Sequence, residues 1–138
     1  MKNFTIALLL LATLSANKCA DKNGAAGMTN IADQKWIFQT LNGERLNLPD
    51  GTEAPWLKMV GDQLQGFGGC NALMGSVKLD GSNVSFPGLG STKKFCEGVQ
   101  PTENAIKGAL GQVQSFKMDG GVLRLLGSAG EVATLRAE

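Results

Sequence analysis

Histidine and tyrosine are absent from this 138-residue sequence, and only 6% of its residues are aromatic. Without histidine there is no Ser-His or Cys-His nucleophile pair, no imidazole zinc site and no histidine acid–base catalysis. These absences remove much of ordinary enzyme chemistry. We therefore expect a protein that is not an enzyme and has no catalytic residues, metal or cofactor.

An excess of charge of one sign is also lacking. The 13 Lys and Arg residues nearly balance the 12 Asp and Glu residues, which leaves a net charge of +1, and Lys93-Lys94 is the one pair of adjacent basic residues. Nucleic acid is therefore not an expected partner. The acidic residues are scattered and form neither a carboxylate dyad nor a calcium loop.

Glycine is abundant by contrast, with 19 residues where a chain of this length usually has about ten. The glycines follow no triplet repeat, so a collagen-like structure is excluded. A chain of this length can bury one core but not two. We therefore expect a single folded domain.

The first residues are typical of an export signal. A short basic start at residues 1–3 precedes an apolar run at residues 4–16, which is too short to span a bilayer. We assign residues 1–18 to a signal peptide. Residues 19–33 are small and polar, show no apolar period and predict a flexible tether.

Cys19 is the predicted lipid attachment site. A bacterial lipoprotein signal ends in small residues directly before a cysteine, and lipidation would avoid an unpaired thiol among three cysteines. Lys18 departs from that pattern, since Gly, Ala or Ser usually stands there. Ordinary cleavage after Ser15 or Ala16 therefore stays open, with Cys19 in a discarded or disordered leader.

Short strands separated by explicit turns are predicted for the rest of the chain. Asx-Gly pairs tolerate positive φ and mark chain reversals. We expect Val77 and Leu79 to pair with Val84 and Phe86 across Asp80-Gly81. The other reversals are expected at Asn42-Gly43, Asp50-Gly51, Gly61-Asp62 and Asp119-Gly120, and the strands at residues 36–41, 56–60, 63–67, 76–79, 83–86, 115–118, 122–126 and 132–136.

One segment has helical spacing instead. Pro101 suits a helix start, and Ile106, Leu110 and Val113 recur at helical intervals, which predicts a helix over residues 101–112. The predicted fold is mainly β (α+β): a curled antiparallel sheet or partly open barrel of seven or eight short strands, with one helix packed on it. A parallel nucleotide-binding sheet would need several crossover helices.

Residues 66–71 are the most glycine-dense stretch. They lack the third glycine of a dinucleotide fingerprint and the Gly-Lys-Ser/Thr ending of a P-loop. We interpret them as a corner where glycine permits a bulge or a close backbone approach. Cys70 lies in this corner and is predicted to form a disulfide with Cys96, the other cysteine of the body. Two separately buried thiols are the alternative.

Several residues of the body resemble the signature of a known family. A tryptophan strand opens the body, a Gly-Cys-Asn motif is followed by a glycine, and a threonine precedes a cysteine by four residues. This arrangement resembles the META domain, the family of the heat-shock lipoprotein HslJ, and we assign it to residues 34–138. The matching signature residues are Trp36, Gly69, Cys70, Asn71, Gly75, Thr92 and Cys96.

The resemblance implies a non-catalytic envelope protein, commonly a lipoprotein of the outer membrane, with a link to heat and antibiotic tolerance. A soluble periplasmic or secreted protein is the alternative location. The membrane, through the lipid anchor, is the expected partner. The alternative function is a binding module or pilot-like chaperone that holds an apolar ligand or an envelope peptide in an open barrel. No cofactor comes with the resemblance.

We interpret the signature as structural. Gly69 would let the chain bend, the side-chain amide of Asn71 would cap backbone groups, and Thr92 would fix the strand that enters Cys96. A binding site at these residues is the alternative interpretation.

Overall fold

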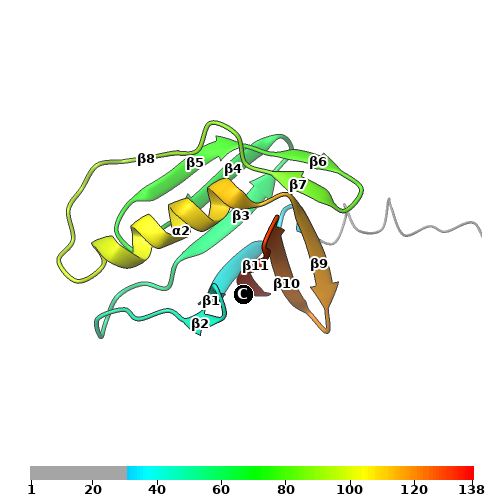
Figure 1. Cartoon of the computed structure of the whole chain (residues 1–138). Helices are drawn as coiled ribbons and strands as arrows, with labels where there is room; N and C mark the ends of the chain where they lie inside the picture. The colour runs from blue at the N-terminus through cyan, green and yellow to red at the C-terminus, as the bar shows by residue number, and fades with distance from the viewer. Residues whose placement is uncertain (1–30) are drawn as a thin grey trace, which may run out of the picture.

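The computed structural model describes residues 31–138, which form a curled antiparallel sheet around one long helix (Figure 1). The helix, α2, spans Gln100–Gln112. The strands are β1 (Lys35–Leu41), β2 (Glu44–Arg45), β3 (Trp56–Val60), β4 (Gln63–Phe67), β5 (Ala72–Ser76), β6 (Lys78–Asp80), β7 (Asn83–Ser85), β8 (Gly90–Ser91), β9 (Ser115–Asp119), β10 (Val122–Gly127) and β11 (Gly130–Ala137).

Ten of these strands form one continuous sheet in the order β6-β7-β9-β10-β11-β1-β3-β4-β5-β8, and β2 pairs with β1 beside this path. Every strand pairing is antiparallel, and β1 lies next to β11 near the middle of the sheet. The predicted fold class is therefore confirmed. The strand count of 11 exceeds the predicted seven or eight.

The additional strands have physical reasons. Two of them, β2 and β8, are only two residues long and carry no period of their own. A third, β5, follows the glycine-rich corner and pairs with β4 along its whole length. The predicted strand over residues 76–79 is correct only at Lys78 and Leu79, which belong to β6. Val77 lies between β5 and β6, where its N–H donates to the Asp62 carbonyl at 2.8 Å, so the predicted pairing of Val77 with Phe86 does not form.

Four of the five predicted reversals lie between paired strands, and the fifth, Asp50-Gly51, is a turn within the loop between β2 and β3, which do not pair. Asn42 and Gly43 both have positive φ, 50° and 85°, and form the predicted reversal, which leads into the unpredicted strand β2. In two other hairpins the turn lies one residue later than predicted. Asp80 and Asp119 still belong to their strands, paired with Asn83 and Val122, so the central residues are 81–82 and 120–121.

Apolar side chains from the sheet and α2 meet in one core. The helix begins at Gln100, one residue before the predicted start, and it buries Ile106, Ala109 and Leu110. Leu79 pairs with Val84 as predicted. The largest fully buried apolar side chains include Trp36, Leu57, Met59, Leu64, Leu123, Leu125 and Leu135.

The folded body includes residues that were assigned to the tether. Ile31 is fully buried, and its carbonyl accepts a hydrogen bond from the indole of Trp36 at 2.9 Å. The predicted tether boundary at residue 33 is therefore too late. Cys19 and the predicted signal peptide lie outside the described residues. Within residues 31–138, no helix has the length and apolar character that crossing a membrane requires.

Candidate functional site

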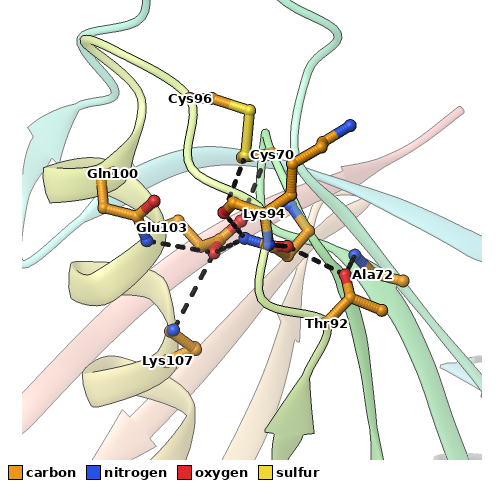
Figure 2. The surroundings of a disulfide bond; sticks show 9 residues. Cys70, Ala72, Thr92, Lys94, Cys96, Gln100, Glu103 and Lys107 are labelled. Atoms are coloured by element: carbon orange, nitrogen blue, oxygen red, sulfur yellow. Dashed lines mark hydrogen bonds and ion pairs between the residues drawn. A yellow bond between two sulfur atoms is a disulfide. The ribbon is translucent and has the colours of Figure 1, made fainter.

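Most of the signature residues meet at the corner between β4 and β5. Residues 68–71 form this corner, the first turn of α2 approaches it from one side, and residues 92–96 approach it from another (Figure 2). Three segments that are far apart in the sequence therefore share one small buried volume. We refer to the hydrogen-bonded groups of this volume as the corner network.

Glycine at the corner allows α2 to come close. A Cβ atom on Gly68 would lie 2.6 Å from Cγ of Glu103, and a Cβ atom on Gly69 would lie 2.8 Å from a methyl carbon of Val99. Gly69 also has a φ of 106°, which side chains disfavour. The missing side chain at Gly68 leaves the space that the Glu103 carboxylate occupies, and the missing side chain at Gly69 leaves the space that Val99 occupies.

Glu103 is the centre of the corner network. Its side chain is fully buried, and its Oε2 accepts hydrogen bonds from the backbone N–H groups of Cys70 at 3.2 Å and Asn71 at 2.6 Å. Its Oε1 accepts from Nδ2 of Asn71 at 2.7 Å and from Nε2 of Gln100 at 3.5 Å. Lys107, one helical turn later, places its ammonium 3.9 Å from Oε1.

These contacts keep the carboxylate charged. Burial by itself raises the pKa of Glu103. The hydrogen bonds from the side chain and backbone of Asn71, the hydrogen bond from the N–H of Cys70 and the charge of Lys107 lower the pKa, and together they outweigh the effect of burial. The pKa is therefore below its ordinary value, so Glu103 is an anion at neutral pH. The first turn of α2 also favours negative charge through the helix dipole.

Asn71 carries the corner network to the 92–96 segment. Its Oδ1 accepts from Oγ1 of Thr92 at 2.9 Å and from the N–H of Lys94 at 2.6 Å, and its Nδ2 donates to the Lys94 carbonyl at 2.8 Å. The Thr92 hydroxyl also accepts from the N–H of Ala72 at 3.2 Å. With Glu103, these bonds use both donors and both acceptor positions of the Asn71 amide.

The disulfide between Cys70 and Cys96 is present, as predicted, with a Cα–Cα distance of 5.8 Å. It fixes the 92–96 segment to the corner one residue away from the Asn71 contacts. Cys70 is almost completely buried, and Cys96 is half-buried. A covalent bond thus joins two of the three segments, and hydrogen bonds join all three.

Two signature residues make none of these contacts. Trp36 belongs to the core, where its indole binds the Ile31 carbonyl. Gly75 lies in β5, where a Cβ atom would approach Cα of Leu89 at 3.3 Å and the Pro87 carbonyl at 3.4 Å. Both residues serve packing, so the structure brings five of the seven signature residues together.

Glu103 was not among the site residues predicted from the sequence, although it lies in the segment predicted to be helical. The sequence does carry one indication of this site. Two adjacent glycines before Cys70 indicate that another part of the chain approaches the backbone closely there. Pairing that signal with a carboxylate 33 residues away needs the tertiary structure.

The corner network is chemically self-contained. Among residues 31–138, every buried side-chain nitrogen and oxygen has a hydrogen-bond partner. Glu103 has no exposed surface through which it could touch a substrate. The arrangement therefore holds a chain reversal, a helix start and a loop together.

Comparisons with known proteins agree with this fold. The NMR structure of a protein from Burkholderia xenovorans is similar with a TM-score of 0.65 and 22% identity, over 100% of this chain and 99% of that chain. A second NMR structure has a TM-score of 0.61 and 17% identity, over 78% of this chain and 92% of that chain. No curated protein matches. The sequence model of the META domain matches residues 29–138, and the chain therefore belongs to the META domain family.

Proposed function

We propose that this protein acts without catalysis in the cell envelope, held at a membrane by a lipid on Cys19, and supports envelope integrity during heat or antibiotic stress. The export signal at residues 1–18 and the resemblance of the signature to a heat-shock lipoprotein family support this proposal. A folded domain on a lipid anchor would act through its surface rather than through an active site.

The corner network is the observation that carries the proposal. A catalytic group must lie within hydrogen-bond reach of the substrate atom on which it acts. The side chains of Glu103 and Asn71 are already hydrogen-bonded to each other and to the backbone, and both are buried. A signature of this kind serves the stability of the domain, which suits a protein that must stay folded in a stressed envelope.

A complementation experiment tests the proposal. A strain that lacks the gene is supplied with the wild-type protein, with Cys19→Ala or with Asn71→Ala, and survival after heat or antibiotic challenge is measured. Wild type should restore survival. Cys19→Ala should leave the membrane fraction and lose protection while its melting temperature stays unchanged. Full protection by a Cys19→Ala protein that no longer fractionates with membranes would contradict the anchor, and unaltered survival of the deletion strain would contradict the stress role.

The alternative, an apolar ligand held inside an open barrel, meets a steric obstacle. The concave side of the sheet holds α2 (Figure 1), and Ile106 and Leu110 fill the space between the helix and the strands. An apolar ligand would have to displace the helix. Native mass spectrometry of the protein purified from its own envelope decides between the two, because a tightly held lipid or polypeptide would appear as added mass.

A further inference from the structure

A groove of about 560 Å³ lies on the face of the sheet opposite the core, and none of the residues that line it belongs to the corner network. The β1–β2 hairpin forms one wall, and β10 and β11 form the other. Three arginines, one acidic residue (Glu131) and three apolar side chains line it together with smaller polar groups, and its hydroxyl and guanidinium groups belong to Thr40, Arg45, Arg124, Thr134 and Arg136.

Strand register explains why these side chains gather. Thr40 of β1 lies opposite Arg45 of β2 and opposite Thr134 of β11, and Thr134 lies opposite Arg124 of β10. Residues directly opposite one another on neighbouring strands point to the same face of a sheet. Four strands therefore present one row with two hydroxyl groups in the middle and a guanidinium at each end.

The floor of the groove has a hydrogen-bond donor to spare. The hydroxyl oxygens of Thr40 and Thr134 lie 2.6 Å apart, and Thr134 is only 8% exposed. One hydroxyl donates to the other, so the accepting hydroxyl keeps its own proton. Residues 31–138 supply no second acceptor for that proton. A ligand oxygen in the groove would satisfy it.

The charges around the floor are incompletely neutralised. Arg124 forms ion pairs with Asp119 at 3.1 Å and with Glu131 at 2.7 Å. Within the described chain, neither Arg45 nor Arg136 forms an ion pair. Both are exposed at the groove and present planar sets of N–H donors.

We propose that this groove binds a phosphate group. Guanidinium groups together with a hydroxyl donor are the donor set that suits a tetrahedral oxyanion, because each N–H or O–H can reach a different oxygen. The groove is open to solvent, so the phosphate could belong to a free small molecule or to a lipid headgroup. Charge and donor geometry are common to both sources.

Titration with inorganic phosphate, followed by NMR of the isotope-labelled protein, tests the proposal. Phosphate should shift the backbone signals of Thr40 and Thr134 and the side-chain N–H signals of Arg45 and Arg136. Replacing both arginines by glutamine should weaken binding by about tenfold or more. The matched control is Lys78→Gln on β6, an exposed cation outside the groove, which should bind phosphate as wild type does.

A second variant separates a specific site from general attraction of anions. Replacing both Thr40 and Thr134 by valine keeps the shapes of the side chains and suits strands, but it removes both hydroxyls. Phosphate binding should weaken while the melting temperature stays close to that of wild type. Equal losses in Lys78→Gln and in the double arginine variant, unchanged binding by the Thr40→Val, Thr134→Val variant, or the absence of any shift at the groove would each overturn the proposal.

Vesicles distinguish the two sources of phosphate. Phosphatidylglycerol vesicles that sediment the Cys19→Ala protein, which can carry no lipid there, but not the same protein with Arg45→Gln and Arg136→Gln, while phosphatidylcholine vesicles sediment neither, would assign the groove to an anionic lipid headgroup. Binding of inorganic phosphate without sedimentation would assign it to a soluble phosphate compound. This test does not depend on the stress role or on the lipid anchor, because it measures binding by the folded domain.

Discussion

Replacing Glu103 by glutamine tests whether the charge of a buried carboxylate holds the corner together. The substitution preserves shape but turns one oxygen into an NH₂ donor. At Oε1 that donor would face Nδ2 of Asn71, and at Oε2 it would face the N–H groups of Cys70 and Asn71. The Asn71 amide cannot turn over to compensate, because the N–H and the carbonyl of Lys94 fix its orientation.

The cost follows from the bonds that are lost. A hydrogen bond to a charged group contributes about 1.5–3 kcal/mol, and a buried donor without an acceptor adds a desolvation penalty. We expect Glu103→Gln to lower the free energy of unfolding at pH 7 by about 2–4 kcal/mol. For a domain of roughly this size, that corresponds to a fall in melting temperature of roughly 10–20 °C.

The pH dependence gives a sharper readout. Because folding lowers the pKa of Glu103, its contribution to stability is fully present above the unfolded pKa of about 4.3 and is lost as the pH falls through the folded pKa. The stability gap between wild type and Glu103→Gln should therefore be widest at pH 7 and should narrow in acid. Urea unfolding at several pH values, with the disulfide intact, measures this gap.

Glu97→Gln is the matched control, since Glu97 is exposed and lies six residues earlier. It should leave stability at pH 7 within about 0.5 kcal/mol of wild type. The reasoning about the corner network is refuted if Glu103→Gln unfolds at the same urea concentration as wild type at pH 7. It is also refuted if the gap stays constant down to strongly acidic pH.

Three further variants probe the same fold. Removing the disulfide with Cys70→Ser and Cys96→Ser should lower stability by about 3.5 kcal/mol in the chain-entropy estimate for a separation of 26 residues, and equal melting temperatures with and without the bond would contradict this. Gly68→Ala should lower the free energy of unfolding in urea by about 1–3 kcal/mol, because its Cβ would overlap Glu103. An unchanged free energy of unfolding would mean that α2 shifts to make room for the methyl group. Gly108→Ala should raise stability by about 0.5–1 kcal/mol, because its Cβ would meet no atom within 4 Å on the helix surface; a lower melting temperature would show an unseen contact.

Local patterns predicted what local chemistry decides. Trp56–Val60 and Gln63–Phe67 match their predicted strands because alternation and a Gly-first turn are both encoded within a few residues. Two of the three Asp-Gly pairs indicated correct hairpins but not their centres, and the third, Asp50-Gly51, lies in a loop between two strands that do not pair with each other. At Asp80 and at Asp119 the glycine is the first residue of the turn, and the aspartate remains in the ladder.

What the sequence did not predict depends on distant partners. The short strand β8 forms because it pairs with the edge of β5. The strand β5 was itself not predicted, because it directly follows the glycine-rich corner. Glu103 gives the same lesson for the site. Its burial requires Gly68 to lack a side chain and Asn71 to point inward, and both conditions come from a segment more than 30 residues away.

The pairing of β1 with β11 has a kinetic consequence. Lys35, in β1, and Glu138, directly after β11, form an ion pair across 103 residues of sequence, and these two strands lie near the middle of the sheet rather than at its edge. The two halves of the sheet can therefore join only after the last strand of the domain has been made. Contacts of such long range slow folding, so we expect the halves to join later than the local hairpins within each half form.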